Sequence, residues 1–310
     1  MPIGLRHLIL RFVLGWLAAA SVQAASVVIL SSESSAAYTQ TSQALIGELE
    51  RRGVPRNELL SVTLLEWTSA TPVGAKLIVT LGAQASEVVA QSAVQIPVLC
   101  TLLPLASFER LLRAHGRRAS PRFTALYLDQ PFDRQLNLIR QALPKAKRLG
   151  VLWEPASTAQ ASALKTQALS RGLTLVSASV DTQNSLFDAL QEVLQDADLL
   201  LALPDPQVYN SSTVQNILLA SFRAKTPVVA FSPSYARAGA LLAVYVTPTQ
   251  IGVQAGTLAS AVLLGKELPA APIPSHDFEV AINEQLAHSL SLRLNAHELR
   301  EKLLTEEARP

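Results

Sequence analysis

The sequence predicts an α/β protein with two Rossmann-like lobes of parallel sheet, hinged around a central cleft. The first observation is a strand–helix–strand unit, in which apolar runs at residues 199–202 and 228–231 flank a segment of helical periodicity at 211–224. Such a unit implies parallel strands covered by helices. The second observation is that the same alternation runs along most of the 310 residues in two series, a length sufficient for two lobes.

The first series follows the N-terminal segment. Gly53 and Pro55 end its first helix at about residue 52, and Gly82 opens its second. Further helices are expected at about 82–92 and 105–114. Strands are expected at residues 26–30, 59–65, 76–81 and 96–102.

The second series begins after a polar loop at residues 115–122. Expected helices lie at 133–143, around 158–170, at 185–195, 211–224 and 248–264. Expected strands lie at 123–128, 147–153, 173–180, 199–202, 228–231, 240–246 and 278–282. A proline-rich link at 268–274 precedes the last strand, Asn283 begins another helix, and the charged tail from Glu298 is expected to fray.

Residues 1–24 have the pattern of a secretory signal peptide. Arg6, His7 and Arg11 form a basic region, residues 12–20 form a short apolar region, and residues 22–24 supply small side chains for cleavage. An uncleaved N-terminal anchor is the alternative. The residue directly after the cleavage position is not a cysteine, so the usual lipid-anchor signal is missing. We therefore expect an exported, periplasmic chain.

Composition restricts the function classes. With 49% hydrophobic and 16% charged residues, the chain is expected to be globular. Its net charge of +2 falls to about zero without Arg6 and Arg11, which does not predict nucleic-acid binding. Cys100 is the only cysteine and is expected to be a buried thiol. A local basic cluster reads as a solvated helix and loop, or alternatively as a phosphate- or partner-binding patch: Arg110, Arg113, Arg117, Arg118 and Arg122.

An ordered set of short motifs carries a family resemblance. It contains Asp205, Tyr209-Asn210, and residues 223–227, 232–235 and 238–242, which read RAKTP, SPSY and AGALL. It continues through residues 252–255, 264–266 and 281–283. This order resembles the periplasmic substrate-binding proteins of poorly characterised ABC transport systems, closely over residues 126–295 and loosely over 26–120.

The resemblance implies a fold of the periplasmic-binding-protein type and a division of the chain. Residues 25–122 and 249–275 would form the N-terminal lobe, and residues 123–248 and 276–310 the C-terminal lobe. It also implies a monomer that captures an amino-acid-like solute, with aromatic amino acids among the candidates. A permease and an ATPase would be separate chains. The alternative is a periplasmic sensing module that signals to a membrane receptor or kinase.

The candidate ligand site lies in the segments that follow the strands, because ligands of open α/β sheets bind beyond the carboxyl ends of the strands. The helix start at Gly82 favours an anion such as a carboxylate, and Asp205 could accept an ammonium group. The structural alternatives are a tight turn at Gly82, a turn or cap at Asp205, and a core side chain at Trp153. The full candidate set is Ser31, Ser32, Gly82, Ala83, Gln84, Trp153, Asp205, Ser232 and Tyr235.

Catalysis is not predicted. The chain contains no G-x-S-x-G elbow, no H-E-x-x-H, no P-loop and no G-x-G-x-x-G. Its five histidines are scattered without ligand spacing, so no metal or other cofactor is expected. A Ser-His-Asp set assembled only by folding stays open at this stage, because such triads are spatial.

Overall fold

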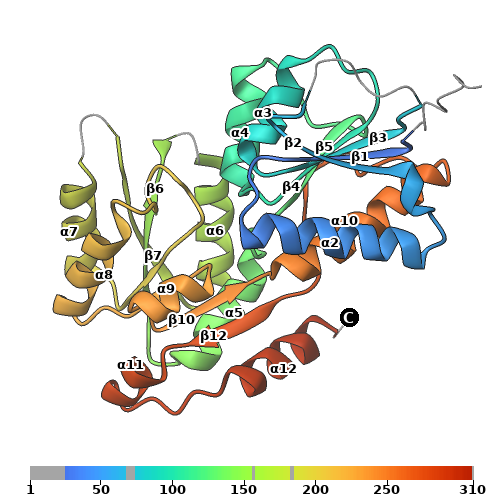
Figure 1. Cartoon of the computed structure of the whole chain (residues 1–310). Coiled ribbons are helices and arrows are strands. Elements are labelled where there is room, and N and C mark those ends of the chain that lie inside the picture. The colour runs from blue at the N-terminus through green and yellow to red at the C-terminus, as the bar shows by residue number, and fades with distance from the viewer. Residues whose placement is uncertain (1–24, 68–73, 156–157, 182–184, 309–310) are drawn as a thin grey trace, which may run out of the picture.

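The computed structural model describes residues 25–67, 74–155, 158–181 and 185–308, and contains two six-stranded sheets (Figure 1). The expected signal peptide at residues 1–24 lies outside the described residues. Within the described ranges, no helix is both long enough and apolar enough to cross a membrane.

The first sheet has the order β11-β5-β4-β3-β1-β2, and all of its pairings are parallel. Its central strands are almost completely buried, as expected for a sheet with helices on both faces. The strands are β1 (Val27–Ser31), β2 (Leu59–Thr63), β3 (Leu77–Leu81), β4 (Val98–Thr101), β5 (Phe123–Tyr127) and β11 (Ile273–Pro274). The helices are α2 (Ala36–Arg51), the 3-10 turn η1 (Arg56–Glu58), α3 (Ala83–Gln91), α4 (Leu105–Ala114) and α10 (Pro248–Leu263).

Helices α2 and α10 cover one face of the first sheet, and α3 and α4 cover the other. Helices α2 and α10 approach each other closely at a glycine of α10 (Figure 1). A Cβ atom on Gly252 would lie 2.4 Å from the carbonyl oxygen of Thr41 in α2. This close contact fixes a late segment of the chain onto the first lobe.

The second sheet has the order β12-β10-β9-β8-β6-β7, in which only the β10–β12 pairing is antiparallel. Its strands are β6 (Arg148–Trp153), β7 (Thr174–Ser179), β8 (Leu199–Leu201), β9 (Val228–Ala230), β10 (Leu242–Tyr245) and β12 (Glu279–Ile282). Its helices are α5 (Phe132–Ala142), α6 (Thr158–Ser170), α7 (Leu186–Asp196), α8 (Val214–Arg223), α9 (Pro233–Ala238), α11 (Glu284–Ser289) and α12 (Ala296–Glu307). Helices α5, α6, α11 and α12 pack on one face, and α7, α8 and α9 on the other.

The structure differs from the sequence-based expectation at three places. Strand β5 pairs with β4 and β11, so residues 123–127 lie in the first sheet, whereas the expected division placed them in the C-terminal lobe. The segment 232–235, where no helix was expected, begins the short helix α9, with Pro233 at its first position. The tail from Glu298 does not fray, because Leu299 and Leu303 of α12 are buried in the second core.

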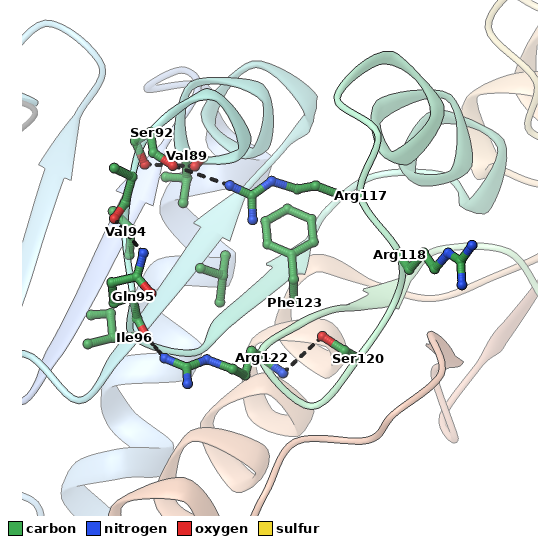
Figure 2. Close-up of a pocket in the computed structure, with 12 residues that line it drawn as sticks. Val89, Ser92, Val94, Gln95, Ile96, Arg117, Arg118, Ser120, Arg122 and Phe123 are labelled. Carbon is green, nitrogen blue, oxygen red and sulfur yellow. Dashed lines mark hydrogen bonds between the residues drawn. The ribbon is translucent and has the colours of Figure 1, made fainter.

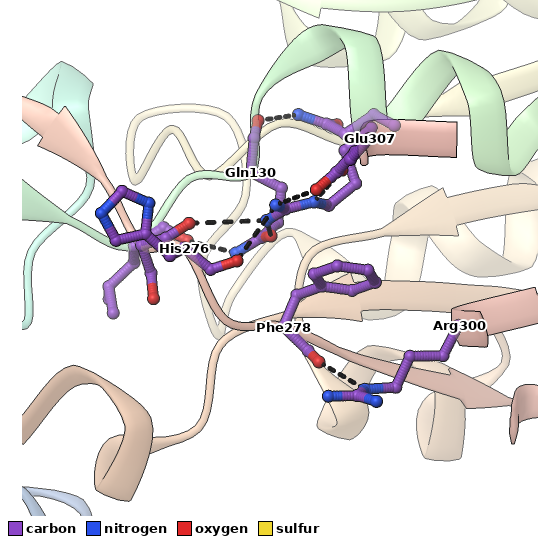
Figure 3. Close-up of polar contacts among 9 residues, drawn as sticks. Gln130, His276, Phe278, Arg300 and Glu307 are labelled. Carbon is purple, nitrogen blue, oxygen red and sulfur yellow. Dashed lines mark hydrogen bonds and ion pairs between the residues drawn. The ribbon is translucent and has the colours of Figure 1, made fainter. Parts of the chain in front are cut away.

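The chain passes between the sheets at three places: after β5, between β10 and α10, and between β11 and β12. Arg134 of α5 joins two of these crossings in a cluster with Gln130, His276 and Glu307, which Figure 3 labels. Its guanidinium donates to Gln130 Oε1 at 2.7 Å in the first crossing and to the carbonyl oxygen of His276 at 3.1 Å in the third. It also forms a fork with the Glu307 carboxylate of α12, with N···O distances of 2.6 and 2.8 Å, and lies 4.0 Å from the Phe278 ring centroid. The C-terminal helix is therefore bonded to the connections that join the lobes.

Candidate functional site

The carboxyl edges of the two sheets meet through helix α4. This helix follows β4 of the first sheet, and its Arg110 reaches two carboxylates that follow strands of the second. The Arg110 Nη2 atom lies 2.9 Å from Oε2 of Glu154, just after β6, and 3.6 Å from Oδ1 of Asp205, after β8. In α6, Gln160 donates to the carboxylate of Glu109 at 3.1 Å, a second bond between the lobes. The segments that follow β6 and β8 of the second sheet therefore contact the helix that follows β4 of the first.

Asp205 is a buried carboxylate, only 6% exposed. It accepts a hydrogen bond from the backbone N–H of Gln207 at 3.0 Å. Burial raises the pKa of Asp205, the nearby Glu154 carboxylate raises it further, and the Arg110 guanidinium opposes both effects. An acceptor in this position is suited to a cationic group, because a buried carboxylate needs a charged or hydrogen-bonding partner.

Asp129, in the first crossing after β5, is a further acidic residue at the same edge. The backbone N–H of Leu105, the first residue of α4, donates to its carboxylate at 2.8 Å. Burial raises the pKa of Asp129 to about 7, and the carboxylates of Glu109 and Asp205 contribute to the rise. Asp129 is absent from the candidate set predicted from the sequence, because its proximity to Asp205 depends on how the two lobes pack.

The predicted residues of the first lobe lie in two neighbouring segments, one that follows β1 and one that joins β3 to α3. Ser31 is buried at the end of β1, and the Ser32 hydroxyl accepts from the Ala85 N–H at 2.9 Å and donates to the Leu81 carbonyl oxygen at 2.8 Å. Gly82 has a φ of 89°, and a Cβ atom there would lie 2.5 Å from the Tyr38 hydroxyl. Gly82 and Ser32 therefore have structural roles where these two segments meet.

Ala83 and Gln84 occupy the first turn of α3 and are exposed. In this turn the backbone N–H groups of a helix precede its hydrogen-bonded interior, so they can donate to an anion. These two residues are the part of the predicted anion site that faces solvent.

The predicted aromatic residues of the second lobe have different surroundings. Trp153, at the end of β6, is 7% exposed and belongs to the second-lobe core, as in its structural alternative. Ser232 caps α9 by accepting from the Tyr235 N–H at 3.4 Å. Tyr235 is half-buried, with its ring centroid 4.7 Å from that of Phe231.

Tyr209 joins this aromatic group to Asp205. Its ring lies edge-on to Phe231 at a centroid distance of 6.1 Å, and its backbone N–H donates to the Asp205 carbonyl oxygen at 2.7 Å. Burial raises the pKa of the Tyr209 phenol, with smaller contributions from Tyr235 and Asp205. The family motif already contained Tyr209, although it was not included in the candidate set.

The predicted basic cluster does not form one patch. Arg110 lies between the lobes, while Arg117 and Arg122 lie at the opposite edge of the first sheet, beside a cavity of about 320 Å³. Figure 2 shows these two side chains directed at the segment 92–96 from either side of Phe123, with Arg118 directed away. Arg117 donates to the carbonyl oxygens of Ala90 and Ser92, and Arg122 to that of Gln95. Their main role is therefore to hold two loops together.

Other chemistry receives little support. Cys100 is fully buried, and burial raises the pKa of its thiol to about 11, which agrees with the predicted core thiol. The described residues contain no group of three or more His, Cys, Asp or Glu side chains placed to hold a metal ion.

Two parallel-stranded lobes whose carboxyl edges face each other, with buried charged groups between them, define the class of two-lobed solute-binding proteins. A family model described as ABC transporter substrate binding protein matches residues 71–304. The chain therefore belongs to this family, whose members bind substrates and are not enzymes.

Comparisons with individual proteins agree with this assignment. A tyrosine-binding protein from Clostridioides difficile (strain R20291) is 25% identical over 224 residues, which span 70% of this chain and 63% of that relative. Among solved structures, a ligand-free, open substrate-binding protein with adhesive properties from Clostridium difficile matches with a TM-score of 0.67 and 20% identity, over 88% of this chain and 96% of that one. An ABC domain from Streptococcus pneumonia in complex with L-Trp matches with a TM-score of 0.60 and 17% identity, over 90% and 98%. These structures establish the fold of this chain.

Proposed function

We propose that this protein is an exported solute-binding protein that captures a small amino-acid-like solute between its lobes and delivers it to an ABC importer. The observation that carries the proposal is Asp205, a buried carboxylate at the carboxyl edge of the second sheet that faces the first lobe. In this role it accepts the ammonium group of the solute in a charge-assisted hydrogen bond.

The other end of the solute is assigned to the first lobe. The exposed first turn of α3, at Ala83 and Gln84, offers backbone N–H groups and the positive end of the helix dipole to a carboxylate. A solute that contacts both lobes favours their closure, because it gains the second set of contacts only in the closed arrangement. The tyrosine-binding relative supports an amino acid as the class of solute, including aromatic ones.

Family membership and the predicted signal peptide support the transport role. A permease and an ATPase on separate chains would receive the solute from a periplasmic binding protein. The Tyr209 backbone donates to Asp205, and its ring packs in an aromatic group with Phe231 and Tyr235. We assign this group to the solute's side chain or to the wall beside it.

The test is a calorimetric titration of the mature chain with the twenty common amino acids, followed by Asp205→Asn. We expect one group of amino acids to bind, and Asp205→Asn to weaken that binding by about 100-fold, corresponding to about 2.7 kcal/mol. Asp196→Asn in the same lobe is the matched control, because the Asp196 side chain is 71% exposed. Unchanged affinity in Asp205→Asn would contradict the assignment, and failure of all twenty amino acids to bind the folded wild type would contradict the proposed class of solute.

A further inference from the structure

Arg110 places a positive charge between two carboxylates of the second lobe. It is the one residue of the first lobe that forms ion pairs with the second among the described residues, and both of its partners are carboxylates of the candidate site. Glu154 accepts a hydrogen bond from Arg110 at 2.9 Å, whereas Asp205 lies farther away, at 3.6 Å. Arg110 therefore neutralises Glu154 first and leaves Asp205 less fully paired.

The charges around Arg110 are unbalanced. Four carboxylates face this contact or influence one another across it: Glu109, Asp129, Glu154 and Asp205. Among the described residues, Arg110 is the only cationic side chain that forms an ion pair with one of these four carboxylates. Without its guanidinium, the site would present two neighbouring carboxylates, Glu154 and Asp205, with no cation between them.

Arg110 is also incompletely hydrogen-bonded. Its Nε atom is inaccessible to solvent and has no hydrogen-bond partner within the described residues. A buried donor without an acceptor costs free energy, so this geometry is not optimised for hydrogen bonding by the arginine alone. The charge of the side chain explains its position better than its hydrogen bonds do.

We propose that Arg110 is a specificity-determining residue that excludes solutes with two positive charges, because its guanidinium occupies the position of the second one. This inference rests on the proposed function and narrows it to amino acids without a positively charged side chain. Binding specificity is a difference between two affinities, and a fixed like charge disfavours the unwanted partner. At short range such repulsion is large, because little water lies between the two charges to screen it.

The test compares L-norvaline with L-2,4-diaminobutyrate, which have the same length and differ by a terminal methyl or ammonium group. Because one Arg110 nitrogen reaches both Glu154 and Asp205, a short diamino acid can span the same two carboxylates once the arginine is removed. We expect wild type to bind norvaline more tightly. In Arg110→Ala the ratio of the two affinities should shift towards diaminobutyrate by about tenfold or more. Arg113→Ala, at an exposed position of the same helix, should leave the ratio unchanged.

Adding Glu154→Gln to Arg110→Ala should abolish the gain, because it removes the carboxylate that the second ammonium would use. A ratio that stays within twofold of wild type in Arg110→Ala, while wild type still binds norvaline, overturns this inference and leaves the proposed function intact. Failure of wild type and of Arg110→Ala to bind either compound also overturns it, and the Asp205 titration then decides the proposed function separately.

Discussion

Replacing Arg134 with alanine should destabilise the protein strongly, although Arg134 lies outside the candidate ligand site. Its side chain, on α5, is only 5% exposed. It forms a fork with Glu307 of α12, donates to Gln130 and to two carbonyl oxygens of the third crossing, and lies over the Phe278 ring. Arg134→Ala removes all of these contacts and leaves the acceptors without their donor.

The magnitude follows from the burial of the ion pair. Removing one partner of a buried pair costs about 3–5 kcal/mol. The Glu307 side chain is 35% exposed and can be hydrated after the change, so we expect the lower end of this range, about 3 kcal/mol. For a chain of this size that corresponds to a fall in melting temperature of roughly 5–10 °C.

Urea denaturation followed by circular dichroism measures this loss, with Arg140→Ala as the control. Arg140 is an exposed residue of the same helix, and its replacement should change the free energy of unfolding by less than about 0.5 kcal/mol. Arg134→Lys keeps the charge but loses the fork, so its stability should fall between wild type and Arg134→Ala. A loss below about 1 kcal/mol in Arg134→Ala would refute the reasoning, since it would mean that the cluster is not a buried network.

Two further predictions concern packing and pH. Gly252→Ala should lower the free energy of unfolding by about 1–3 kcal/mol, because its Cβ would lie 2.4 Å from the Thr41 carbonyl oxygen. Gly47→Ala in α2 is the control, and it should be neutral or stabilising because a Cβ there has nothing within 4 Å. Equal effects of the two substitutions in thermal denaturation would contradict the close-packing argument. Burial raises the pKa of Asp129 to about 7, so between about pH 4 and 7 the folded state holds a proton that the unfolded state has released. The free energy of unfolding should therefore fall as the pH rises through this window, and Asp129→Asn should flatten the fall. Urea denaturation at a series of pH values measures both proteins. Identical pH profiles for wild type and Asp129→Asn would count against a raised pKa of Asp129.

The order of strands and helices was predictable from the sequence because it depends on local periodicity. The strand–helix–strand unit from β8 to β9 and the helices α4, α7 and α10 lie within a few residues of their expected bounds. Alternating apolar runs and helical spacing fix such elements within windows of ten to fifteen residues. Proline and glycine, as at Gly53 and Pro144, marked several of the ends.

Places where the prediction failed involve contacts between distant segments. The charged composition of the tail from Glu298 suggested fraying, but Leu299, Leu303 and Glu307 each find partners on elements far away in the sequence. Likewise, β5 could be recognised as a strand from its own residues, but its place in the first sheet depends on pairing with β4 and β11. Local patterns contain no information about which sheet a strand joins.

The sequence by itself determined the fold class, the family and the loops that follow the strands, since these depend on periodicity and on motifs read in order. Asp205 was assigned to the candidate ligand site in this way. Only the tertiary structure decided that Arg110, 44 residues before Glu154 and 95 before Asp205, lies between their carboxylates. That position depends on how the two lobes face each other across three chain crossings. The charged groups of the site interact with one another only in that arrangement.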